Sequence, residues 1–245
     1  MNEIIKIMKY LKKFENHSQY EATKQDLILP NVSLCQQENE VHYNPYVDPY
    51  NGHEYVDLGL PSETKWATMN VGAENQTNKG LYFAWGETEG YVNESTSIKD
   101  FRWDDYQWTE DDGSTLSKYN ATDSKTVLDL EDDAANVNWG GGWHMPTKEQ
   151  CEELLNTTYV INAWVTNYQG SGVNGLLFTS VSNGNTMFVP AAGYWDEDGI
   201  TAGRCHVWSA CVSTRISTAY FFSDSGNVNP LGDRCDGKSV RGVVG

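Results

Sequence analysis

Residues 138–147 read Asn138-Trp-Gly-Gly-Gly-Trp-His-Met-Pro-Thr147, and they lead into the helix that the sequence predicts most clearly. Thr147 is a favourable N-cap, and Gln150 stands three residues later, which is the spacing of a capping box. Cys151 and Leu154 follow on what would be the buried helical face, so Cys151 is expected to be a small core residue and not a nucleophile. Three carboxylates favour the start of this helix electrostatically: Glu149, Glu152 and Glu153.

Around this helix the sequence is strand-like and rich in turns. The 245 residues include 22 Gly, 9 Trp and 14 Tyr, a composition that suits short strands and tight turns around aromatic packing. All nine Trp lie between Trp66 and Trp208, so the large core is expected after about residue 52. Three short apolar runs predict buried strands: residues 80–85, 175–180 and 187–190. We therefore predict an α+β domain of short twisted antiparallel strands, few helices and long loops.

The charge balance is strongly acidic. The chain has 17 Lys+Arg against 34 Asp+Glu, a net charge of −17 at pH 7. Such a field repels phosphate, which excludes a nucleic-acid-binding surface over the whole molecule. No apolar run approaches the roughly 18 residues that a membrane span needs, so no membrane insertion is expected.

The first residues do not resemble a secretory signal. Lysines interrupt the apolar residues there: Lys6, Lys9, Lys12 and Lys13. The chain is therefore expected to be made in the cytoplasm, a reducing compartment. Its five cysteines are an odd number without a CxxC pair, which favours free thiols over a disulfide framework.

Residues 1–50 form a separate segment in this interpretation. Apolar residues between Ile4 and Phe14 share one helical face, and this short helix is expected to pack against its own domain or against sister subunits, with binding to a membrane surface as the alternative. Residues 27–34 and 40–43 predict two short strands, and residues 44–52 are a linker rich in Pro, Asn and Gly. The segment is a small helix and strand appendage suited to attachment or homo-oligomerisation.

Motifs for catalysis are weak. Gly170-Ser-Gly-Val-Asn-Gly175 matches the GxGxxG pattern of a dinucleotide-binding loop. That loop must lead into a helix, whereas the residues that follow here predict a strand, so we interpret the segment as a hairpin loop. Residues 100–133 hold 11 Asp+Glu against 3 Lys+Arg without a calcium-loop pattern, and a solvated acidic face is expected. Cys205, His206 and Cys211 leave a soft-metal site open, although their spacing fits no structural zinc module. We expect no enzyme activity, no cofactor and no metal.

The last fifty residues look specialised. Charged, aromatic and thiol side chains alternate there with Ser and Gly without periodicity, and loops on a rigid scaffold are where binding residues concentrate. An ordinary irregular C-terminus is the alternative, and Phe222 is expected to be core. The candidate ligand-binding residues are Trp195, Asp196, Asp198, Arg204, Cys205, His206, Cys211, Val212, Ser213, Arg215, Ile216, Phe221, Asp224, Leu231, Asp233, Cys235 and Lys238.

Several motifs together resemble the Fibrobacter succinogenes major paralogous domain. They are His53-Glu-Tyr-Val-Asp-Leu-Gly-Leu-Pro-Ser62, Lys65-Trp-Ala-Thr-Met-Asn-Val-Gly-Ala73, Tyr82-Phe-Ala-Trp-Gly-Glu87, residues 132–135 and 138–147, Pro190-Ala-Ala-Gly-Tyr194 and Gly237-Lys-Ser-Val-Arg241. The resemblance covers about residues 53–245 and implies a C-type-lectin-like fold, related to that of formylglycine-generating enzymes. Residues 29–33 and 40–45 are similar to segments that precede such domains in phage-encoded proteins of gut bacteria.

A subset of this family resembles the variable proteins of diversity-generating retroelements, in which adenines at the 3′ end of the gene are rewritten. This chain keeps framework such as Trp208-Ser209, Ser225-Gly-Asn-Val-Asn-Pro230 and Ser239-Val-Arg241. Where Asn or Tyr would be common it has other residues: Arg204, Cys205, His206, Cys211, Arg215, Asp233, Cys235 and Lys238. The resemblance implies a variable region at about residues 195–242.

The resemblance implies a non-enzymatic protein that presents a variable binding face to a host or cell-surface protein or glycan. A phage tail component released by lysis fits this role. Two alternatives stay open: a metal-dependent oxidase-like enzyme of the formylglycine-generating fold, and a fixed-specificity structural surface module. The calcium-binding triplets of animal lectins are absent, so calcium-dependent sugar binding is not implied.

Overall fold

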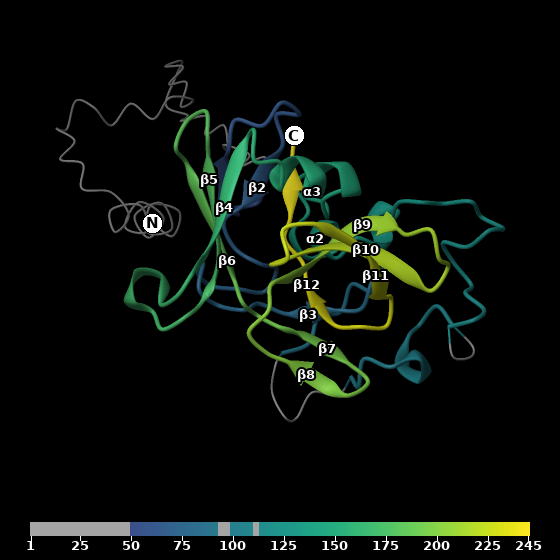
Figure 1. Cartoon of the computed structure of the whole chain (residues 1–245). Helices are drawn as coiled ribbons and strands as arrows, with labels where there is room; N and C mark the ends of the chain where they lie inside the picture. The colour runs from purple at the N-terminus through teal and green to yellow at the C-terminus, as the bar shows by residue number, and fades with distance from the viewer. Residues whose placement is uncertain (1–49, 93–98, 110–112) are drawn as a thin grey trace, which may run out of the picture. The chain divides into compact units, whose positions relative to one another are not determined.

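The computed structural model describes residues 50–92, 99–109 and 113–245 (Figure 1). The helix and the two strands predicted before residue 44 lie outside the described residues. Most neighbouring strands in the described part are antiparallel, and only two α-helices occur there, which confirms the α+β class. No helix among the described residues is long and apolar enough to cross a membrane.

The elements are short and many. The strands are β1 (Tyr55–Asp57), β2 (Lys65–Ala67), β3 (Tyr82–Phe83), β4 (Val160–Val165), β5 (Gly175–Ser180), β6 (Thr186–Pro190), β7 (Tyr194–Asp196), β8 (Gly199–Thr201), β9 (His206–Val212), β10 (Thr218–Ser223), β11 (Val228–Asp233), β12 (Lys238–Ser239) and β13 (Val243–Val244). The helices are α2 (Ala134–Trp139) and α3 (Lys148–Leu154), with 3-10 turns η1 (Trp103–Asp105), η2 (Leu130–Asp132) and η3 (Tyr168–Gly170).

Helix α3 forms as its local signals predict. The Thr147 hydroxyl accepts a hydrogen bond from the Gln150 amide at 3.2 Å, and the Gln150 side chain accepts one from the Thr147 amide at 2.8 Å. This reciprocal pair satisfies two amides that a helix start leaves without partners. Cys151 and Leu154 are fully buried, so the predicted core role of Cys151 is confirmed.

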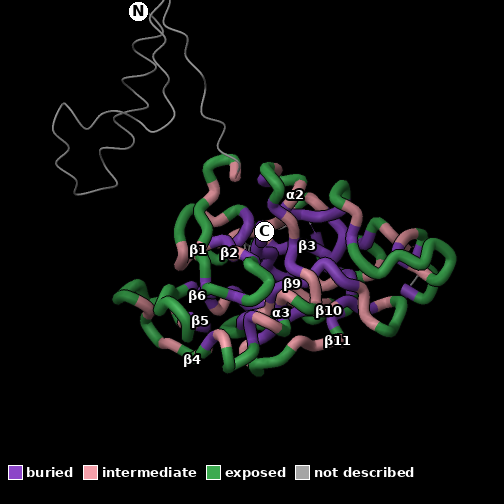
Figure 2. The backbone as a smooth tube through the Cα atoms, turned by 90° about the horizontal axis from the view of Figure 1, so that it is seen from above, coloured by how far each residue is buried: buried purple, intermediate pink, exposed green. Residues whose placement is uncertain are grey.

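The central sheet has the order β11-β10-β9-β12-β3, in which only the β9–β12 contact is parallel. Two buried tryptophans tie its middle together. The indole of Trp85 donates to the Ser209 carbonyl at 2.9 Å, and the indole of Trp208 donates to the Phe83 carbonyl at 2.8 Å. Phe222 is fully buried in this sheet, as predicted. Figure 2 shows buried residues following β3 and β9, with exposed residues in the surrounding loops.

A second sheet, β1-β2-β13, joins the two ends of the described domain. Arg241 precedes β13 and is fully buried. Its guanidinium donates to the Asn70 side chain and to the Phe188 carbonyl, each at 2.9 Å. It also reaches the carbonyls of Ala67 and Thr68, so one cation satisfies acceptors from two parts of the chain, residues 67–70 and Phe188.

The third sheet, β4-β5-β6, is antiparallel throughout and lies on the left of Figure 1. Residues 166–174 connect β4 to β5 and include η3. The predicted hairpin loop at residues 170–175 is therefore confirmed, and no helix follows it. The predicted strands 175–180 and 187–190 correspond to β5 and β6.

The acidic segment that precedes α2 is held by lysines. Lys118 forms ion pairs with Glu131 and Asp132, and Lys125 pairs with Asp129. Asp129, Glu131 and Asp132 are the only group of three clustered metal-ligating side chains in the described part of the chain. Each carboxylate of this group is therefore paired with a lysine, although two lysines offset only part of its three negative charges.

Candidate ligand-binding site

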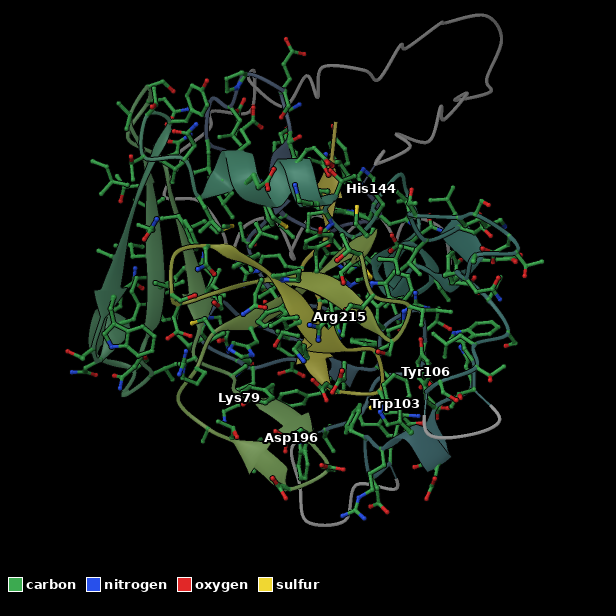
Figure 3. The ribbon with its side chains drawn as sticks, turned by 45° about the vertical axis from the view of Figure 1, so that its right-hand side comes forward. Lys79, Trp103, Tyr106, His144, Asp196 and Arg215 are labelled. Atoms are coloured by element: carbon green, nitrogen blue, oxygen red, sulfur yellow. The ribbon has the colours of Figure 1, made fainter. Side chains whose placement is uncertain are left out.

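A cavity of about 340 Å³ lies between the β7–β8 hairpin, the central sheet and the segment around η1. We call it the C-terminal pocket. Figure 3 shows Asp196 on the β7–β8 hairpin and Trp103 on the neighbouring segment, both below the central sheet. The pocket is lined by Arg102, Trp103, Tyr194, Asp196, Glu197, Asp198, His206, Phe221, Leu231, Gly232, Asp233, Cys235, Asp236 and Lys238.

The floor of the pocket is an ammonium group held among aromatic rings. The side chain of Lys238 is 2% exposed, and its Nζ lies 2.6 Å from a carboxylate oxygen of Asp236. The same Nζ lies 4.2 Å from the ring centroid of Trp208, 5.0 Å from that of Phe221 and 5.3 Å from that of Tyr194. Ring faces attract cations, and this attraction is strongest where water is excluded. Burial lowers the pKa of Lys238, and Asp236 opposes this effect.

His206 lies between two of these rings, stacked on Tyr194 and tilted against Phe221. Its ring centroid lies 4.4 Å from that of Tyr194 at an interplanar angle of 6°, and 4.7 Å from that of Phe221. Its Nδ1 is buried and has no hydrogen-bond partner. Burial, with a further contribution from the Lys238 charge, lowers the pKa of His206 to about 3. The imidazole is therefore neutral at physiological pH and serves as a third flat ring.

Backbone hydrogen bonds position the carboxylates of the β7–β8 hairpin, which form one wall of the pocket. Trp195 and Gly237 exchange two backbone hydrogen bonds of 2.8 and 2.9 Å, which hold β7 against the segment that leads into β12. The Asp198 amide donates to the Asp196 carboxylate at 3.0 Å and tightens the β7–β8 turn. This pairing brings the carboxylates of the hairpin to the side of the pocket that also carries Asp236.

The opposite wall comes from residues about a hundred positions earlier. Lys99 and Glu87 form a buried ion pair at 2.8 Å, and the Lys99 ammonium also donates to the Asp105 carbonyl at 2.5 Å. These contacts anchor the segment that carries Arg102 and Trp103. The Arg102 guanidinium donates across the pocket mouth to the Glu197 carbonyl at 2.8 Å.

Eight of the seventeen predicted residues line the C-terminal pocket: Asp196, Asp198, His206, Phe221, Leu231, Asp233, Cys235 and Lys238. Asp198, Leu231 and Asp233 are exposed at its rim, whereas Phe221, Cys235 and Lys238 are buried in its floor. The eight residues come from the β7–β8 turn and from β9 to β12. The fold therefore brings together side chains that are spread over about forty positions of sequence.

Four other predicted residues are packed outside the pocket. Cys205 is fully buried, and its thiol donates to the Val189 carbonyl at 3.5 Å. Cys211 is buried beside α3, where its sulfur accepts a hydrogen bond from the Lys148 amide. Val212 packs against the core, and the Trp195 ring stacks on Phe101. We leave these four residues out of the candidate site.

The remaining five lie on other parts of the surface. Arg204 and Asp224 form an ion pair of 3.0 Å, and Asp224 also accepts a hydrogen bond from the Cys205 amide. Arg215 and Ile216 are exposed in the β9–β10 turn, and the Ser213 hydroxyl bonds that of Thr218 at the base of this turn. This turn is separate from the pocket lining.

Sequence reasoning missed six lining residues: Arg102, Trp103, Tyr194, Glu197, Gly232 and Asp236. Tyr194 ends the family motif at residues 190–194, and Glu197, Gly232 and Asp236 fall inside the predicted variable region. Arg102 and Trp103 carry the weakest signal, because they lie in an acidic segment far away in the sequence. The only sequence signal in this part is that Arg102 is one of three basic residues in a segment that is otherwise acidic.

The chemistry of the pocket suits binding. The Cys235 thiol is buried, and burial raises its pKa, with nearby Asp236 and Asp233 raising it further. This thiol therefore stays protonated and is a poor nucleophile. Burial likewise raises the pKa of Cys205 to about 12. Cys205, His206 and Cys211 do not form a cluster of metal ligands in the described residues.

What the pocket offers is a rigid aromatic floor, a wall of carboxylates and an exposed rim. Comparison with known proteins adds no assignment to this geometry. No protein-family model, no curated protein and no solved structure matches the chain.

Proposed function

We propose that this chain is a non-enzymatic binding protein and that the C-terminal pocket is its ligand-binding site. The observation that carries this proposal is the convergence of the specialised C-terminal residues on one cavity of about 340 Å³. Binding pockets combine apolar walls with a few fixed polar groups, and this pocket combines aromatic rings with carboxylates. The proposed ligand is a protein or glycan on a host or cell surface.

The proposed fold of residues 53–245 is C-type-lectin-like. Short antiparallel strands, two short helices and long irregular connections support it. The proposed variable region, residues 195–242, spans both the rim and the floor of the pocket. Rim residues such as Leu231, which is 57% exposed, can change without disturbing the core. We propose that diversification is concentrated at such rim positions, and that residues 1–50 attach or oligomerise the chain in a phage tail.

Diversification is tested by deep sequencing of the 3′ end of the gene, and of any near-repeat beside it, in a growing population. We expect changes at adenine positions of a repeat, falling on codons within about 195–242. Rim codons should vary more often than the codons of Cys205 and Cys211, which are buried. An invariant 3′ end without a template repeat would contradict the retroelement proposal and leave a fixed-specificity binder.

Binding is tested separately with labelled full chain on a panel of intact gut-bacterial cells. Leu231→Ser removes an apolar rim side chain, and Ile161→Ser on β4 is its matched control, because both side chains are 57% exposed. We expect cell retention to fall at least severalfold for Leu231→Ser and to stay unchanged for Ile161→Ser. Equal retention of both variants and the native chain would overturn the assignment of the pocket as the binding site.

A further inference from the structure

We infer that the C-terminal pocket binds a cationic organic group, an ammonium or guanidinium carried by a basic side chain or an amine of the ligand. This inference rests on the proposed binding function and names the chemical class of its ligand. The pocket combines two features that favour such a group: carboxylates without a direct ion-pair partner, and aromatic residues in its lining.

The charges that line the pocket are mostly negative. Five carboxylates line it against two basic side chains, Arg102 and Lys238. Asp236 is paired with Lys238 at 2.6 Å. Within the described residues, no basic side chain lies at ion-pair distance from Glu197, Asp198 or Asp233. These three carboxylates therefore carry negative charge without a direct ion-pair partner, although the charges of Lys238 and Arg215 act on Asp233 from farther away.

The carboxylates are also close enough to affect one another. Burial raises the pKa of Asp236, and the charges of Asp233 and Asp196 raise it further against the opposing effect of Lys238. Like charges that converge on a partly enclosed cavity repel, and a bound cation relieves this repulsion. The same electrostatic field attracts cations and repels anions during approach to the pocket.

Only one of the two basic groups is exposed, and that is Arg102. The Lys238 ammonium is enclosed by Asp236 and three aromatic rings, and its side chain is 2% exposed. The Arg102 guanidinium already donates to the Glu197 carbonyl. An anionic ligand would therefore meet five carboxylates with Arg102 as its one exposed positive partner.

The aromatic floor already holds one ammonium, that of Lys238, close to ring faces and a carboxylate. Three rings surround Lys238 Nζ within 5.3 Å of their centroids, with one carboxylate as counter-ion. His206 and Trp103 also line the cavity. His206 is neutral, so it adds no positive charge to the lining. Aromatic surfaces with nearby carboxylates are how proteins bind ammonium ligands.

A metal ion fits this arrangement less well. A bound cation such as Ca²⁺ needs several oxygen ligands converging on one point. The pocket carboxylates do not form a group of three within reach of one ion, and the one such group in the described residues is elsewhere, at residues 129–132. Carboxylates spread along a wall suit a larger organic cation.

The inference is tested by NMR titration of the full chain with three probes of similar shape: choline, neutral 3,3-dimethylbutanol and anionic 3,3-dimethylbutyrate. We expect choline to shift the ring resonances of Trp103 and His206, with a millimolar or tighter Kd. The neutral probe should bind at least about fivefold more weakly, since it lacks the ion pairs and the cation–ring attraction. The anion should not bind.

A pair of double variants locates the site. Asp198→Asn with Asp233→Asn neutralises two exposed rim carboxylates, and we expect choline binding to weaken roughly fivefold to tenfold. Glu54→Gln with Glu74→Gln makes the same change in net charge at exposed positions outside the pocket and should leave the Kd within about twofold.

The outcomes are distinct. Equal binding of choline and its neutral isostere, or equal weakening by both double variants, overturns the cation inference. So does the absence of any shift with choline at millimolar concentrations. None of these results affects the proposed binding function, which the Leu231→Ser comparison on cells tests independently.

Discussion

Replacing Lys238 by Met tests how the pocket floor is held together. The substitution keeps an unbranched apolar stem but removes the ammonium, which leaves the Asp236 carboxylate without its partner at 2.6 Å. The side chains of this pair are 2% and 15% exposed, so water cannot fully replace the lost partner. Breaking a buried ion pair from one side costs about 3–5 kcal/mol. Loss of the attraction to three ring faces adds to this, and the retained apolar stem offsets part of it.

We therefore expect the free energy of unfolding to fall by about 3 kcal/mol at pH 7. For a domain of this size the corresponding decrease in Tm is roughly 6–12 °C. The measurement is urea and thermal unfolding followed by tryptophan fluorescence. Lys148→Met is the matched control, because Lys148 pairs with Glu152 at 2.6 Å with side chains 30% and 51% exposed. The control should lose less than about 0.5 kcal/mol.

Two further results decide whether the ion pair is the reason. The double variant Lys238→Met with Asp236→Asn removes both charges and should return to within about 1 kcal/mol of the native chain. The deficit of the single variant should also shrink as the pH falls, because the folded variant then binds a proton on Asp236 more readily than the unfolded chain does. A single variant that loses less than about 1 kcal/mol, or a double variant no more stable than the single one, would refute this account.

Other predictions concern the rest of the described domain. Because the pKa of folded His206 is about 3, the unfolded chain gains a proton near pH 6.5 that the folded chain does not. The free energy of unfolding should therefore fall by about 1.4 kcal/mol per pH unit as the pH decreases below about 6.5. In urea unfolding measured at several pH values, His206→Phe should remove this contribution to the slope. Arg241→Met should cost about 3–5 kcal/mol, since it leaves carbonyls of Ala67 and Phe188 unpaired; a loss below about 1 kcal/mol would show that these contacts contribute little. Four of the five cysteines are buried thiols, so a thiol-reactive dye should label at most one per native chain and five in denaturant; rapid native labelling of Cys205 would contradict its burial.

Local signals in the sequence predicted local structure well. The capping box at Thr147 and Gln150 needs only neighbouring residues, and it formed as predicted. The same holds for the strand at residues 175–180, whose apolar run is bounded by a glycine turn. The capping box depends on hydrogen bonds between neighbouring residues, and the strand depends on one uninterrupted apolar run. Both patterns can be recognised in the amino-acid sequence.

The pocket could be predicted only in part, for physical reasons. Strand β9 is buried on both faces over most of its length, so alternation cannot separate its core residues from its pocket residues. The sequence pattern therefore could not separate His206, which lines the pocket, from Cys211, which is buried in the core. A buried ion pair between Lys99 and Glu87 anchors the segment that carries Trp103 beside the pocket. Because charged residues ordinarily lie at the surface, their types alone do not indicate this buried anchor. Long-range pairing of this kind has no local signature.

The sheet that joins the two ends of the domain also has a mechanical consequence. β1 and β13 both run antiparallel to β2, so they are parallel to each other. The chain enters β1 opposite Ala67 and leaves β13 opposite Lys65, at opposite ends of the middle strand. Tension between the two ends therefore loads both ladders in shear, with their hydrogen bonds stretched together instead of opening one after another. In Figure 1 the β7–β8 hairpin lies on the far side from β13, so such tension would pass through the domain while the pocket walls stay unstrained.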